Sequence, residues 1–204
     1  MNGRRDAAVY RLAVLGATRV GKSSLIRQWI FHEFSREHVP TVEERHRHSF
    51  KCGESGILSS LVVIDTGGDQ QFPAMQQLYM KEAQVFLLVF SVDSRASLEE
   101  AGKLRDKIIA ARGGQSHSPV ILVASKVDLP CSKWEISDDE ISDVSVEWDC
   151  PLVLASAKKN LRVDDMFGTA LKLCKEYVGC PSMNDKKDNE KKWKSKNKSN
   201  CSLM

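Results

Sequence analysis

The chain has 204 residues, enough for one domain with a substantial hydrophobic core, and apolar residues make up 42% of it. No apolar run approaches the roughly 18 residues that a membrane-spanning helix needs, and no apolar signal segment opens the sequence. The six cysteines form no C-x-x-C pair, which argues against a zinc site and a disulfide framework. We therefore expect a cytosolic globular protein.

Charge is unevenly distributed along the chain, whose net charge is +3. Residues 182–200 carry seven lysines and three acidic residues, so the rest of the chain is close to neutral. This segment lacks helical or strand periodicity and is too polar to bury itself. The expected organisation is a flexible N-terminus at 1–7, a globular domain at 8–179 and a disordered basic tail at 180–204.

The strands are predicted from nearly continuous apolar runs that end in glycine, acidic or polar residues. In chain order these runs lie at 8–16, 58–68, 83–93, 119–128 and 150–158, and alternation at 45–52 predicts an additional edge strand. Helical segments are expected at 23–31, 95–112, 135–148 and 161–177, the last with an apolar stripe that begins at Leu161. Buried strands alternating with helices predict a doubly wound α/β sheet, whose ligands bind beyond the carboxyl ends of the strands.

The first predicted strand runs directly into residues 16–24, GATRVGKSS, which match the phosphate-loop pattern G-x-x-x-x-G-K-[ST]. Backbone N–H groups of such a loop surround a β-phosphate, beside the positive end of the following helix. Lys22 would contact the β- and γ-phosphate oxygens, and the Ser23 hydroxyl would bind Mg²⁺. A glycine-rich turn that matches by chance is the alternative, which the flanking strand and helix disfavour. The predicted nucleotide-contacting residues are Gly16, Ala17, Thr18, Arg19, Val20, Gly21, Lys22, Ser23 and Ser24.

The second buried strand ends in DTGG, with an aspartate that is a poor core residue unless it is paired or linked to a metal. Asp65 fits the role of holding the Mg²⁺ shell, and Gly68 can offer its N–H group to a γ-phosphate. The D-x-x-G pattern alone is a weak signal, and an ordinary turn explains it equally well. Its position one strand away from the phosphate loop favours the functional interpretation.

Two further strand ends, SKVD and SAK, carry residues suited to a guanine base. Asp128 can accept two hydrogen bonds from the guanine N1–H and exocyclic amine, a pattern that adenine cannot supply. The Lys126 stem can lie over the ring, and backbone N–H groups of residues 156–158 can reach the guanine oxygen. Each tripeptide alone would also suit a surface loop. The predicted base-contacting residues are Ser125, Lys126, Asp128, Ser156, Ala157 and Lys158.

These elements, in this order, resemble the Ras superfamily of small GTPases over residues 8–178. The segments DQQFPAMQQL and LVFSVDSRASLEE and the basic tail most resemble the Di-Ras branch. The resemblance implies a P-loop NTPase G domain, with a six-stranded, mostly parallel sheet and five helices, that binds GTP or GDP with Mg²⁺. An ATP-using P-loop kinase or ATPase is the rival interpretation, which Asp128 and the absence of a lid-like insertion disfavour.

The resemblance also assigns roles that the motifs alone do not. It makes Thr41 the second Mg²⁺ ligand and γ-phosphate sensor, and it packs Phe34 edge-on against the guanine. Segments 38–46 and 66–80 become the two switch surfaces that effector proteins bind. An exchange factor and a GTPase-activating protein are further expected partners of a monomeric protein that does not bind nucleic acid.

Three departures from the family pattern affect the expected activity. Thr18 and Arg19 replace two glycines of the phosphate loop, and Thr18 occupies space needed by the attacking water or an arginine finger, whereas the Arg19 side chain should point to solvent. Asp69 stands where the family has a water-orienting glutamine; a carboxylate is shorter, only accepts hydrogen bonds and repels the γ-phosphate. Ser125 replaces the asparagine of N-K-x-D and is expected to lose its bridges to guanine N7 and to the phosphate loop, weakening nucleotide retention by about 1–3 kcal/mol.

The site is therefore predicted to bind GTP and to hydrolyse it slowly. The catalytic positions are Lys22, Thr41, Gly68 and the degenerate Asp69. A GTP-bound scaffold without useful hydrolysis, regulated by exchange or abundance, is the alternative.

The last four residues, CSLM, fit the C-a-a-X prenylation pattern at Cys201 with a farnesyl-favouring methionine. One prenyl chain anchors stably only with a second signal, which the lysines upstream would supply. This predicts attachment to the cytoplasmic face of the plasma membrane, whereas the lysines alone would suit a solvated tail. Cys180 is expected to be an unmodified thiol, with palmitoylation as the alternative.

Overall fold

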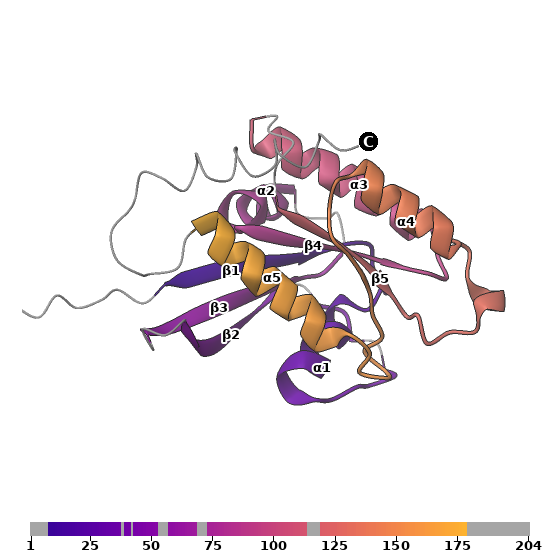
Figure 1. Cartoon of the computed structure of the whole chain (residues 1–204), viewed down its shortest axis with the longest axis horizontal. Helices are drawn as coiled ribbons and strands as arrows, with labels where there is room; N and C mark the ends of the chain where they lie inside the picture. Colours follow the sequence, from indigo (N-terminus) through magenta and orange to yellow (C-terminus); the bar gives the residue numbers. More distant parts are fainter. Residues whose placement is uncertain are drawn as a thin grey trace, which may run out of the picture.

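A six-stranded sheet forms the centre of the molecule in the computed structural model (Figure 1). The structure describes residues 8–37, 39–41, 43–52, 57–68, 73–113 and 119–178. The strands are β1 (Val9–Leu15), β2 (Glu43–Cys52), β3 (Ile57–Thr66), β4 (Val85–Ser91), β5 (Val120–Ser125) and β6 (Leu152–Leu154), in the order β2-β3-β1-β4-β5-β6. Only β2 runs antiparallel to its neighbour, so the predicted mostly parallel sheet with an added edge strand is confirmed.

Helices cover both faces of this sheet, as Figure 1 shows. They are α1 (Lys22–Phe31), α2 (Pro73–Glu82), α3 (Arg95–Ala111), α4 (Asp138–Glu147) and α5 (Val163–Val178), with a short 3₁₀ turn at Cys131–Lys133. The core residues of α1 and α5 pack on one face, and those of α2, α3 and α4 pack on the other. All seven residues of the central strand β4 are buried, as expected of a strand covered on both sides.

Two helix starts differ from the sequence prediction by more than one residue, for local reasons. Leu161, expected to begin the apolar stripe of the last helix, pairs with Ser156 as an isolated bridge and is 47% exposed. Arg162 then takes a left-handed conformation, so α5 begins at Val163. Helix α4 begins at Asp138 because the side chain of Ser137 accepts a hydrogen bond from the Glu140 N–H and caps the helix.

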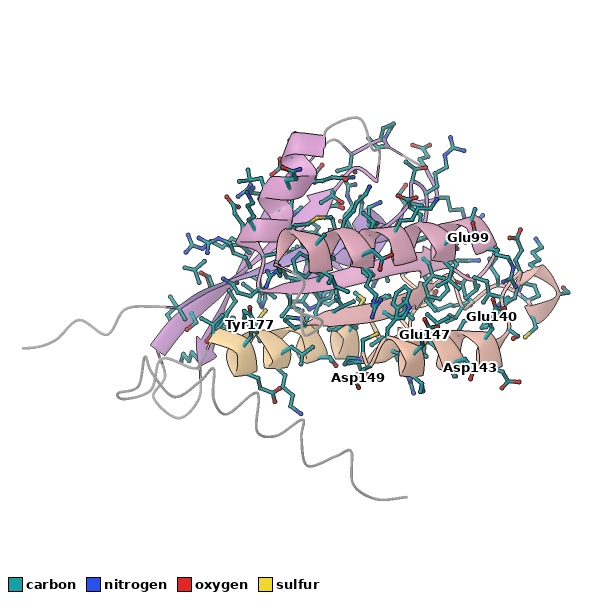
Figure 2. All side chains as sticks on the ribbon, turned by 90° about the horizontal axis from the view of Figure 1, so that it is seen from above. Glu99, Glu140, Asp143, Glu147, Asp149 and Tyr177 are labelled. Carbon is teal, nitrogen blue, oxygen red and sulfur yellow. The ribbon has the colours of Figure 1, made fainter. Side chains whose placement is uncertain are left out.

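Helix α4 presents acidic side chains to solvent. Figure 2 shows Glu140, Asp143 and Glu147 along this helix, with Glu99 of α3 nearby. Glu140 pairs with Arg95 at the start of α3. None of these carboxylates lines the cleft described below, so they do not place negative charge inside it.

Within the described part of the chain, no helix is both long and apolar enough to cross a membrane.

Candidate functional site

An open cleft of about 950 Å³ lies where the carboxyl ends of the strands meet, a volume typical of a small-molecule site. The predicted residues that line it are Thr18, Arg19, Val20, Gly21, Lys22, Ser23, Ser24, Phe34, Thr41, Ser125, Lys126, Asp128, Ala157 and Lys158. Residues from the first predicted motif, at 16–24, and from the last, at 156–158, thus line the same cavity. The other described residues of the predicted site contact or closely approach this lining; they are Gly16, Ala17, Asp65, Gly68 and Ser156.

The loop between β1 and α1 depends on glycine at two positions. Gly16 has φ +149°, and a Cβ atom there would lie 2.0 Å from the carbonyl oxygen of Val89 on the adjacent strand β4. Gly21 has φ +97°, in the left-handed region that favours glycine, immediately before α1 begins. The loop therefore closes tightly over the strand end, and the first turn of α1 opens toward the cleft.

Lys22 lies inside this loop rather than in solvent. Its Nζ atom donates hydrogen bonds to the carbonyl oxygens of Gly16 and Ala17, at 3.0 and 2.8 Å. Lys22 is only 6% exposed, and this burial lowers its pKa to about 8 even though the charge of Asp65 acts in the opposite direction. The ammonium is thus held by carbonyl dipoles and lacks a full counter-charge, so added anionic groups would stabilise it.

Three oxygen-bearing side chains meet beside Lys22. The Ser23 Oγ and Thr41 Oγ1 atoms are 3.0 Å apart, although these residues lie on α1 and on the segment before β2. Asp65 is 1% exposed, and of its side-chain atoms Oδ1 has no hydrogen-bond partner among the described residues. Burial raises the pKa of Asp65, while a hydrogen bond from Ser23 and the charge of Lys22 lower it. Two hydroxyls and an unsatisfied carboxylate oxygen suit a hard cation such as Mg²⁺, so the residues present fit the predicted metal.

The segment after β3 packs against the loop between β1 and α1. Gly68 has φ +56°, and a Cβ atom there would lie 2.4 Å from Lys22 Nζ and 2.8 Å from the Ala17 carbonyl oxygen. Any other residue would therefore displace Lys22 or the loop. The predicted contact of the Gly68 N–H group with a γ-phosphate stays a prediction, and Asp69 lies outside the described residues.

Thr18 and Arg19 are both exposed at the rim of the cleft. Arg19 has φ +61°, a left-handed conformation that costs a non-glycine residue roughly 1–2 kcal/mol. The exposure of Arg19 agrees with a side chain directed to solvent. That Thr18 crowds the reacting centre stays a prediction.

At the other end of the cleft, Asp128 is held by two neighbours from the loop after β6. The Ser156 hydroxyl donates to Asp128 Oδ1 at 2.6 Å, and Lys158 Nζ lies 3.6 Å from Oδ2. The Ser156 N–H group donates to the carbonyl oxygen of Leu161, so this N–H group is engaged. A contact of Ala157 or Lys158 with a base oxygen stays a prediction.

The structure corrects one prediction at Ser125. Its hydroxyl donates a hydrogen bond to the carbonyl oxygen of Val20 in the phosphate loop, so the expected loss of this bridge is wrong. Ser125 is 2% exposed and ends β5, and this position brings even a short side chain within reach of the loop. Only the lost contact with guanine N7 remains as a reason to expect weaker retention.

Sequence reasoning missed the partner of Lys126. The Lys126 Nζ atom lies 3.3 and 3.4 Å from the two carboxylate oxygens of Asp93, and Ser91 donates a hydrogen bond to Oδ1 of that carboxylate. Asp93 follows the end of β4, Asp65 lies near the end of β3, and Asp128 follows the end of β5. The same placement rule applied to FSVD would have identified it.

The described parts of the two predicted effector segments, 38–46 and 66–80, contact one another. The Tyr79 hydroxyl of α2 donates to Glu43 Oε2 of β2 at 2.8 Å, and burial together with Glu43 raises the Tyr79 pKa to about 12. Positions 38, 42 and 69–72 lie outside the described residues.

Phe34 is exposed on the cleft wall, and its packing against a base stays a prediction. Cys180 and Cys201 also lie outside the described residues.

Comparison with known proteins agrees with this fold and cleft. The Ras family model matches residues 11–176, and the chain belongs to the Ras family. The resemblance inferred from the motifs and the G-domain fold class are therefore confirmed.

Three curated relatives place the chain near one branch of that family. It is 36% identical over 195 residues to GTP-binding protein Di-Ras2 of Macaca fascicularis. It is 35% identical to GTP-binding protein Di-Ras2 of Mus musculus and to GTP-binding protein Di-Ras1 of Homo sapiens. Each match covers 96% of this chain and 96% of the relative.

Proposed function

We propose that the protein is a guanine-nucleotide switch that binds GTP and GDP with Mg²⁺ and hydrolyses GTP slowly. One observation carries the proposal: a single cleft has a buried lysine and a cation-ready oxygen cluster at one end and an oriented aspartate at the other. Lys22 and the open first turn of α1 suit a polyphosphate. Asp128 suits a guanine base, and the names of the relatives, as GTP-binding proteins, support the same ligand.

The metal site follows from the same cluster. Ser23 and Thr41 would hold Mg²⁺ through their hydroxyls, and Asp65 would hold it through water. When bound, the metal would supply positive charge that offsets the negative charge of the phosphate groups. Lys22 would add a second positive charge, and its pKa, which burial lowers to about 8, would rise when phosphates surround the ammonium.

Switching depends on whether a γ-phosphate is present. Thr41 and Gly68 belong to the two segments that close over the phosphate loop, so contacts with a γ-phosphate would order both. The Tyr79–Glu43 hydrogen bond joins these segments and supports a combined surface at 38–46 and 66–80 for effector proteins. An exchange factor and a GTPase-activating protein would act on the same segments.

Slow hydrolysis is expected from two departures from the family sequence pattern. Thr18 lines the cleft, where a β-branched side chain takes the space of the attacking water or of an arginine finger. Asp69 replaces the water-orienting glutamine with an acceptor-only anion. We expect intrinsic hydrolysis slower than the roughly 3–5 × 10⁻⁴ s⁻¹ typical of Ras, and a weak response to an activating protein.

The test is single-turnover GTP hydrolysis by the unaltered protein and by the double variant Thr18→Gly, Asp69→Gln, after identifying the nucleotide that co-purifies. Faster hydrolysis by the double variant supports the proposal. Equal rates mean that these two residues do not limit the chemistry. A rate of zero in both proteins, with GTP retained, favours a non-hydrolysing scaffold, and stabilisation by ATP but not by GTP refutes the guanine assignment.

Membrane attachment is a further part of the proposal, based on CSLM at 201–204 and the lysines of the tail. We expect Cys201→Ser to move the protein from the cytoplasmic face of the plasma membrane to the cytosol, measured by cell fractionation. Replacing Lys186, Lys187, Lys191 and Lys192 by glutamine should weaken attachment in a salt-sensitive manner. Persistent membrane association of the Cys201→Ser variant would show that the tail is not the anchor.

A further inference from the structure

Lys126 borders the cleft in a conformation that needs support. It directly follows β5 and has φ +60°, in the left-handed region where a non-glycine side chain is strained. Such strain persists only where surrounding contacts over-determine the backbone, and it is common at ligand sites. Contacts that hold this residue therefore also decide where its long stem lies in the cleft.

Asp93 supplies the main polar contact. The Lys126 ammonium is almost equidistant from both Asp93 carboxylate oxygens, at 3.3 and 3.4 Å. Lys126 lines the cleft and Asp93 does not, so this side chain reaches from the cleft lining to a carboxylate outside it. The ion pair thus fixes the far end of the Lys126 methylene stem.

Asp93 is itself fixed by the sheet. Ser91, which donates to Asp93 Oδ1, is the last residue of β4 and pairs in register with Ser125 of β5. The Ser91 N–H group donates to the Ser97 hydroxyl of α3 at 2.9 Å. Burial raises the pKa of Asp93, but the Ser91 hydrogen bond and the Lys126 charge lower it more, so the net shift is downward and the carboxylate stays ionised.

We propose that Asp93 is a positioning residue for the nucleotide base, which holds the Lys126 stem along the base-binding wall through the chain Ser91–Asp93–Lys126. The proposal rests on the guanine-binding function proposed above and adds a residue outside the family motifs. It also explains how the base end can retain a nucleotide although Ser125 uses its hydroxyl on Val20 rather than on a base.

A double-mutant cycle on the full-length, GDP-loaded protein tests this role. Asp93→Asn keeps the side-chain shape and removes the charge, and Lys126→Met keeps an apolar stem and removes the ammonium. Because the pair is about one-third exposed, with side-chain exposures of 33% and 37%, Asp93→Asn should speed GDP release by about two- to fivefold. In the Lys126→Met background the same substitution should have no further effect, because the group through which Asp93 acts is gone.

Glu140→Gln is the matched control, because it breaks the exposed ion pair between Glu140 and Arg95. Arg95 lies two residues after Asp93 in the sequence, and neither partner of this pair lines the cleft. Its GDP release rate should equal that of the unaltered protein. The acceleration of release on Mg²⁺ chelation should be the same in Asp93→Asn as in the unaltered protein, because the phosphate end is untouched. A general loss of folding would change this ratio and the melting temperature as well.

Two results would overturn the positioning role. One is equal acceleration by Asp93→Asn with and without the Lys126 ammonium, and the other is a release rate unchanged by Asp93→Asn. Either result leaves the proposed function intact as long as the unaltered protein holds GDP. Failure of the unaltered protein to bind any guanine nucleotide would refute the proposed function and the positioning role together.

Discussion

The two ends of the cleft are prepared for a ligand in opposite ways. At the phosphate end, among the described residues, the Lys22 ammonium donates hydrogen bonds to two backbone carbonyl groups, and Asp65 Oδ1 has no hydrogen-bond partner. Burial lowers the Lys22 pKa although the charge of Asp65 opposes this shift. At the base end, Asp128 and Lys126 already have protein partners of opposite charge or hydrogen-bonding type. The charged groups at the phosphate end thus lack full partners among the described residues, whereas those at the base end have them.

This difference indicates where affinity and selectivity arise. Buried charges without full partners gain strongly when a polyphosphate and a cation bind, so we expect the phosphate end to supply most of the binding free energy. Groups that already have partners gain little on binding, but their fixed orientation rejects a base with the wrong donor pattern. We therefore expect the phosphate end to determine how tightly a nucleotide binds and the base end to determine which nucleotide binds.

The largest effect is expected for Lys22→Met. Removing a buried charge that faces the phosphates should weaken GTP and GDP binding by about 2–5 kcal/mol, roughly 30-fold to several-thousand-fold, measured by titration calorimetry. Lys158→Met at the base end is the matched control, because that ammonium is 45% exposed and its loss should cost less than about fivefold. Equal losses in the two variants would remove the contrast between the ends.

The next effect is expected for Asp128→Asn. The amide keeps an oxygen that can accept from Ser156 but offers a donor where the guanine N1–H group needs an acceptor. GTP affinity should fall by roughly 100-fold and xanthosine triphosphate affinity should rise, measured by competition with a fluorescent nucleotide. Unchanged GTP affinity would place the base elsewhere in the cleft.

The smallest effect is a dependence of binding on pH. In the folded, nucleotide-free protein the Lys22 pKa is about 8, below the ordinary 10.5. Between pH 8 and pH 10.5 the unfolded chain therefore binds more protons than the folded protein, and the free energy of unfolding rises with pH across this range. Phosphates restore the proton on binding, so GTP affinity should decline above pH 8, by about fivefold to tenfold between pH 7.5 and 9. Lys22→Arg, which stays charged, should lose this component, and an identical decline in both proteins would assign the titration to another group.

Local pattern alone was sufficient for the alternating elements and for most of the cleft. Continuous apolar runs predict strands buried on both faces, and the residue at each carboxyl end then faces one edge of the sheet because parallel strands share a direction. Asp65 and Asp128 were predicted in this way, and the phosphate-loop motif predicted Lys22 and Ser23. Helix α2 escaped the analysis of periodicity because its apolar residues form no pronounced stripe; only the family resemblance implied a fifth helix.

Tertiary structure decided the contacts between side chains that are distant in the sequence. The bridge from Ser125 to Val20, the ion pair between Asp93 and Lys126 and the hydrogen bond from Tyr79 to Glu43 each join two elements. A pattern of residue types specifies which face a side chain occupies, but not whether a short hydroxyl reaches a loop 105 residues away in sequence. That reach depends on strand register and loop closure, which only the packed sheet sets.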